Sequence, residues 1–164
     1  MGGRVRRPVP IAAICLALVA GLAASGCGAT DDATPAACLG GPGAYLKALA
    51  GAPGRAGLSD GTAISDCLAQ NQTAGDLAAV GSAMLSAATT LNAEARKDPG
   101  GPKNLQLGFL IGAAQRGAEG SEGIHAELIR RLSTAASYSP GRQVLSPQFE
   151  KTYREGFDAG HAAG

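Results

Sequence analysis

Residues 73–97 read TAGDLAAVGSAMLSAATTLNAEARK, and this stretch decides the fold. Apolar residues recur in it at alternating steps of three and four, the spacing of one face of an amphipathic helix; they are Leu77, Val80, Met84, Ala87 and Leu91. The next step falls on Glu94, and Ala95 continues the apolar face in its place. Thr73 followed by Asp76 resembles a capping box, and a Pro-Gly-Gly sequence follows the last turn. The stretch therefore predicts one long helix.

Shorter helical patterns lie on both sides of this helix, separated by turns rich in glycine and proline. They cover residues 42–50, 63–68, 103–116 and 122–137, and a last one begins at Ser146-Pro147. No stretch shows the sustained alternation of β-branched residues that a strand needs, so a sheet is not supported. The sequence predicts an all-α domain over residues 38–164, a small bundle of about five helices.

Capping residues and apolar faces add detail to two of these helices. Residues 59–62 offer side-chain oxygens to cap the helix over residues 63–68, and Ser121 offers one to the helix over residues 122–137. The second of these helices has an apolar face that we expect to be buried, formed by Ile124, Leu128, Leu132 and Ala135.

Two helical patterns carry glycines four residues apart, Gly108 with Gly112 and Gly156 with Gly160. Each internal glycine costs a helix about 1 kcal/mol relative to Ala, and close approach of another helix to the bare backbone would compensate. We expect Gly108 and Gly112 to pack within the chain rather than to mediate dimerisation, which is the use of this spacing in membrane spans. Aromatic residues recur every four positions beside the second pair, and we expect this ridge to dock into the bundle and supply much of its core: Phe149, Tyr153 and Phe157.

The N-terminal residues have the form of a secretory signal peptide. Arg4, Arg6 and Arg7 supply a positive patch, and residues 11–24 supply an apolar core. At about 1.5 Å per residue this core reaches about 21 Å as a helix, which is short of the roughly 30 Å thickness of the hydrocarbon layer. We therefore expect residues 1–26 to be a cleaved leader rather than a permanent transmembrane helix.

The leader ends in Ala24-Ser25-Gly26-Cys27, which resembles the lipobox of bacterial lipoproteins. The resemblance implies that the Cys27 thiol receives a diacylglyceryl group and that a peptidase cuts just before it. Two acyl chains hold a protein durably on a bilayer, so the expected location is the extracytoplasmic face of the cell membrane. Leu is commoner than Ala at position 24, and small residues at positions 24 and 26 also suit the general signal peptidase. A freely secreted protein is therefore the alternative.

Residues 27–37 are small and polar and predict a flexible tether. The chain has four cysteines. Cys15 leaves with the leader and Cys27 is the expected lipid site, so Cys38 and Cys67 remain as a pair. Oxidising conditions outside the cytoplasm favour a disulfide between them, and closing a loop of about 30 residues would stabilise the fold by roughly 3.5 kcal/mol in the chain-entropy model. A metal or redox site is not indicated, because further ligands and a C-x-x-C spacing are missing.

Composition argues against one class of partner. The full chain has 14 basic and 13 acidic residues. Removal of the leader takes away three arginines, so 11 basic residues face 13 acidic ones and the net charge becomes −2. No basic stripe remains to neutralise phosphates, and we expect no binding to nucleic acid.

The chain has no Trp and many of its apolar residues are Ala, so each packed side chain buries little area and the core should be thin.

The sequence contains no recognisable catalytic or cofactor-binding motif. Glu122 and His125 lie three residues apart on a predicted helix and could face one metal ion, but two ligands do not make a site. We expect an exposed polar pair there, and we expect His161, close to the end of the sequence, to be solvated. These residues predict no metal and no cofactor.

The pattern as a whole favours a non-catalytic, membrane-anchored domain of the cell envelope. Such a domain would bind another envelope protein or a small apolar ligand. Two alternatives stay open: an envelope enzyme that uses Glu122, His125 or His161, and a freely secreted helical protein.

Overall fold

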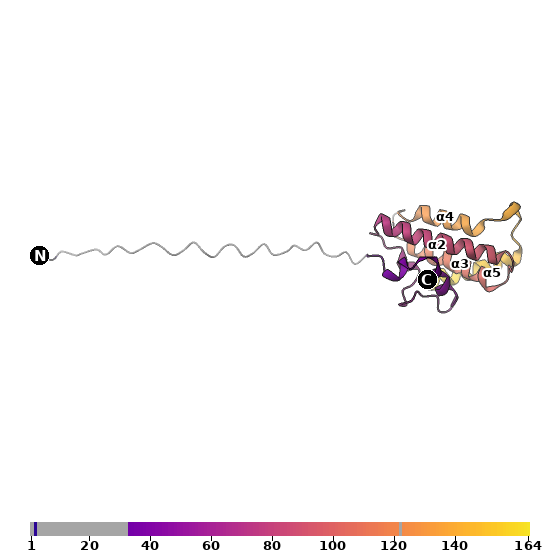
Figure 1. The fold of residues 1–164 in the computed structure, drawn as a ribbon, viewed down its shortest axis with the longest axis horizontal. Helices are drawn as coiled ribbons and strands as arrows, with labels where there is room; N and C mark the ends of the chain where they lie inside the picture. Colours follow the sequence, from indigo (N-terminus) through magenta and orange to yellow (C-terminus); the bar gives the residue numbers. More distant parts are fainter. Residues whose placement is uncertain (1, 3–32, 122) are drawn as a thin grey trace.

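The structure, a computed structural model, describes Gly2, residues 33–121 and residues 123–164. Apart from Gly2, the expected leader lies outside these residues, and so do Cys27 and Glu122. The described part of the chain forms five α-helices and three 3₁₀ helices and contains no strand, which confirms the predicted all-α fold (Figure 1). In chain order the elements are η1 (Ala36–Leu39), α1 (Gly41–Leu49), η2 (Ser65–Cys67), α2 (Ala74–Ala95), α3 (Pro102–Ala118), α4 (Ala126–Ser137), η3 (Pro140–Arg142) and α5 (Pro147–Ala163).

The long helix predicted from residues 73–97 is α2, and its start has the predicted cap. The Thr73 hydroxyl accepts a hydrogen bond from the Asp76 backbone N–H at 3.1 Å. Along the predicted apolar face Leu77 is half-buried, and the other four residues are buried. Ala95 is also buried, so the apolar face continues past Glu94 as expected.

α3 is the central helix of the bundle. It packs against α2, α4 and α5, while α1 packs chiefly on α2 (Figure 1). Six of its apolar residues are buried: Leu107, Phe109, Leu110, Ile111, Ala113 and Ala114. Because partners surround it, this helix has little surface left for water.

The two glycine pairs face each other between α3 and α5. A Cβ atom added to Gly108 would collide with the Tyr153 carbonyl oxygen, and one added to Gly156 would collide with the Leu105 carbonyl oxygen. Gly112 and Gly160 stand in the same relation to backbone of the opposite helix. The close helix approach expected at Gly108 and Gly112 is therefore confirmed, and α5 is the helix that makes it.

The disulfide joins Cys38 of η1 to Cys67 of η2, with their Cα atoms 5.4 Å apart. Both residues are fully buried. The Tyr45 hydroxyl on α1 donates a hydrogen bond to the Cys38 carbonyl at 2.9 Å, and burial raises the pKa of this phenol well above its usual range. The disulfide therefore lies in the hydrophobic core of the domain.

Three local expectations were wrong. The helix expected over residues 63–68 is only the 3₁₀ turn η2, and the Asp60 carboxylate accepts from the Thr62 N–H in the turn before it rather than capping a helix. α4 begins at Ala126 rather than at residue 122, and the Ser121 hydroxyl donates to the Ala118 carbonyl instead of capping α4. Ile124, expected to be buried, precedes the helix and is 54% exposed.

Candidate functional site

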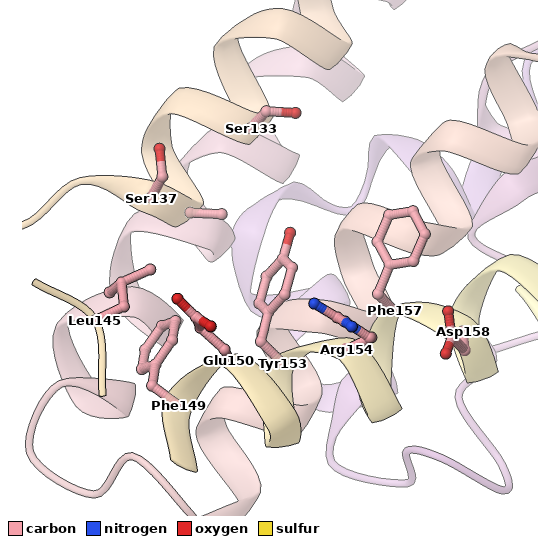
Figure 2. A pocket seen from close by; sticks show the side chains of 10 residues that line it. Ser133, Ser137, Leu145, Phe149, Glu150, Tyr153, Arg154, Phe157 and Asp158 are labelled. Atoms are coloured by element: carbon pink, nitrogen blue, oxygen red, sulfur yellow. The ribbon is translucent and has the colours of Figure 1, made fainter. Parts of the chain in front are cut away.

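An open groove with a volume of about 470 Å³ runs between α4 and α5 (Figure 2). Both helices pack on α3 and leave this space between them. Small side chains line it on α4, and aromatic and charged side chains line it on α5. The lining residues are Ser133, Ala136 and Ser137 of α4, Leu145 of the connection, and Phe149, Glu150, Tyr153, Arg154, Phe157 and Asp158 of α5.

The aromatic residues of α5 form a continuous row of rings. The ring centroids of Phe149 and Tyr153 lie 6.3 Å apart and those of Tyr153 and Phe157 lie 6.4 Å apart, because residues four positions apart share one face of a helix. Phe149 is buried as expected, whereas Tyr153 and Phe157 are half-buried and rise from α5 toward α4 (Figure 2). The ridge thus supplies one residue to the core and forms a wall of the groove with the other two.

Charged residues follow the rings along the outer edge of the groove. Glu150, Arg154 and Asp158 are exposed and lie four residues apart, each directly after an aromatic residue. No ion pair joins these three side chains within the described part of the chain; the α5 pair that does form is Lys151 with Glu155, at 4.0 Å. The groove therefore has an apolar wall and an edge on which the charge alternates.

Arg96, the residue directly after α2, donates hydrogen bonds to the end of α4 beside the groove. Its guanidinium donates to the Tyr138 carbonyl at 2.8 Å and to the Ser137 carbonyl at 3.2 Å, and it lies 4.6 Å from the centre of the Phe149 ring. Asn92 donates to the same Tyr138 carbonyl at 2.8 Å. These bonds satisfy carbonyl groups that a helix leaves unpaired at its C-terminus. Arg96 follows the last turn of α2 in the chain, and tertiary packing lets its side chain cap α4.

The two histidines lie apart from each other and outside the lining of the groove. His125 is fully buried immediately before α4, and neither ring nitrogen has a hydrogen-bond partner among the described residues. The expectation that His125 is exposed was therefore wrong. His161 is partly exposed, with its Nε2 atom 2.7 Å from Glu119 Oε1 and its ring stacked on Phe157.

The burial of His125 predicts a loss of stability at acidic pH. Desolvation lowers the pKa of this imidazole below 6.5. The unfolded state therefore binds the proton more readily than the folded state. The folded state with its neutral imidazole has its full stability above about pH 6.5, and it loses stability as the pH falls below this value. We expect the melting temperature to fall by a few degrees more in the parent than in His125→Leu between about pH 8 and pH 5. Parallel curves for the parent and His125→Leu would contradict the prediction.

The described residues contain no group of three or more His, Cys, Asp or Glu side chains placed to hold a metal ion. Among the described helices, none combines the length and hydropathy that crossing a membrane requires. A comparison of the chain with protein-family models, curated proteins and solved structures finds no match.

Proposed function

We propose that the chain is a cell-envelope lipoprotein, anchored through Cys27, whose helical domain binds a small apolar ligand in the groove between α4 and α5. The single observation that supports ligand binding is the groove itself. Its volume of about 470 Å³ lies within the usual range of small-molecule sites. Apolar atoms make up most of its exposed lining surface, as in such sites, although two serines and three charged residues also line it.

The groove favours binding over catalysis. Neither histidine is among its lining residues, and the titratable groups that do line it are the exposed Glu150, Arg154 and Asp158 and the phenol of Tyr153. Burial raises the pKa of Tyr153 to about 12, so the hydroxyl stays protonated at neutral pH and is a poor general base. An apolar ligand would instead gain from covering the half-buried faces of Tyr153 and Phe157.

A side chain that fills the groove should abolish ligand binding. Ser133 is exposed on α4 and points into the space above α5 (Figure 2), so Ser133→Phe would occupy the volume a ligand needs. We expect the affinity for the fluorescent apolar probe N-phenyl-1-naphthylamine to fall by at least about tenfold, which corresponds to about 1.4 kcal/mol. The matched control is Thr134→Phe, at an exposed position of the same helix outside the groove. Equal affinity of both variants and the parent would contradict the proposal.

The anchor has a separate test, because Cys27 lies outside the described residues. Cys27→Ser in the full chain removes the thiol that would carry the acyl groups, and we expect the protein to move from the membrane fraction to the soluble fraction of an expressing bacterium. Incorporation of radiolabelled palmitate should be lost in the same variant. Unchanged fractionation together with no labelling of the parent would favour the freely secreted alternative.

A further inference from the structure

We propose that the ligand of the α4–α5 groove is a zwitterionic, phospholipid-like amphiphile, bound as a single molecule with its apolar chain on the aromatic wall and its head at the charged edge. The inference rests on the proposed binding function and adds the chemistry of the head group. The apolar chain would lie on the aromatic wall of the groove, and the head group would lie at its charged edge. Both surfaces belong to α5.

The aromatic and charged positions of α5 alternate in a fixed register. Phe149 precedes Glu150, Tyr153 precedes Arg154, and Phe157 precedes Asp158. Successive pairs lie one helical turn apart, so the side chains of each kind form a row with about 5–6 Å between Cβ atoms. One row is the apolar wall and the other is the edge exposed to water. A ligand lying along α5 therefore meets an apolar surface and a charged surface together.

The order of charges along the edge selects among head groups. Arg154 lies between Glu150 and Asp158, and none of the three forms an ion pair within the described residues. A simple anion on Arg154 would be repelled by a carboxylate on each side, and a simple cation on either carboxylate would be repelled by the guanidinium. A head that carries a phosphate and an ammonium one short linker apart can pair with Arg154 and with a neighbouring carboxylate at once. Guanidinium groups suit phosphate, because they donate two parallel hydrogen bonds to its oxygens.

The Tyr153 hydroxyl adds a hydrogen-bond donor inside the groove. It stands at the tip of the ring, in the space between α5 and α4 (Figure 2). Burial is the cause of its raised pKa, and no hydrogen bond to a described residue contributes. The hydroxyl can therefore donate to an oxygen of a ligand inside the groove.

Four single-chain amphiphiles with the same dodecyl tail separate the effect of the head from that of the tail. The probes are dodecylphosphocholine, dodecyl sulfate, dodecyltrimethylammonium and dodecyl maltoside, each below its micellar concentration and titrated against the mature protein with bound N-phenyl-1-naphthylamine. We expect dodecylphosphocholine to displace the dye about tenfold more effectively than the other three. Arg154→Gln should remove that preference, so that dodecylphosphocholine displaces the dye no better than dodecyl maltoside does. Arg131→Gln, at an exposed position of α4 outside the groove, is the matched control and should behave as the parent.

The outcomes separate this inference from the function on which it rests. Equal displacement by all four probes, or a preference that survives Arg154→Gln, would overturn the zwitterionic head and leave the apolar groove intact. A preference for dodecyl sulfate or for dodecyltrimethylammonium would overturn it as well. If Ser133→Phe leaves the binding of every probe and of the dye unchanged, the groove is not the binding site and the proposed function fails with the inference.

Discussion

Gly108→Ala is expected to lower the free energy of unfolding by about 3 kcal/mol, at the upper end of the cost of overpacking. The added Cβ would overlap the Tyr153 carbonyl oxygen and approach the Phe157 nitrogen to 2.8 Å. Neither atom can move alone, because both belong to the backbone of α5. The two helices must separate, and the three other glycines between them would then lose their close contacts as well. Chemical denaturation followed by circular dichroism measures the change.

The direction of the change in the free energy of unfolding distinguishes a glycine in close helix packing from an exposed helical glycine. At an exposed helical position Gly→Ala stabilises a protein, since alanine is better by about 1 kcal/mol in a helix. Gly43 of α1 is such a position: it is exposed, and an added Cβ would meet nothing within 4 Å. Gly43→Ala is therefore the matched control and should raise the free energy of unfolding. If Gly108→Ala also stabilised the protein, the close packing of α3 on α5 would be wrong.

The same glycines show how far sequence reasoning reaches. The spacing of Gly108 and Gly112 predicts a close helix neighbour, because glycine inside a helix lowers its stability unless another helix packs closely against it. The spacing does not say which helix that neighbour is. The partner is α5, whose Gly156 and Gly160 have the same spacing, and the sequence signal that could have identified it is this repetition of one pattern in two helices.

The groove was harder to foresee, since it depends on which faces of α5 the bundle covers. From sequence the densest apolar ridge, formed by Phe149, Tyr153 and Phe157, was expected to enter the core. The glycines allow closer contact with α3 than aromatic rings would, so the glycine face of α5 takes that contact and leaves Tyr153 and Phe157 only half-buried. Hydrophobicity alone does not distinguish a residue that fills a core from one that lines a groove.

His125 shows how the exact position of a buried face decides exposure. The buried face expected for this helix was centred closer to Ile124, which is 54% exposed. The buried residues of α4 are instead Leu128, Leu132 and Ala136. His125 lies three and seven residues before the first two of these, so it falls on the same face of the helix and its side chain is buried.

Replacing both half-cystines, Cys38→Ala with Cys67→Ala, is expected to destabilise the domain by about 3.5 kcal/mol. The bond closes a loop with a sequence separation of 29, and in the chain-entropy model a loop of this size contributes roughly that amount. The loss should be greatest in the first half of the domain. There the disulfide joins two 3₁₀ turns, and each turn contacts a different long helix, η1 contacting α2 and η2 contacting α3.

Hydrogen exchange resolves where the stability is lost. In the double variant the amides of α1 should exchange much faster, because this helix is short and its Tyr45 hydroxyl is bonded to the Cys38 carbonyl. The amides of α3 and α5 should keep more of their protection, since the contact between their glycines does not involve the bond. Reduced parent protein is the matched control, because it lacks the crosslink and keeps both side chains. If reduction and double substitution changed exchange uniformly across all five α-helices, the disulfide would be stabilising the bundle as a whole, and the local loss of protection predicted for α1 would be wrong.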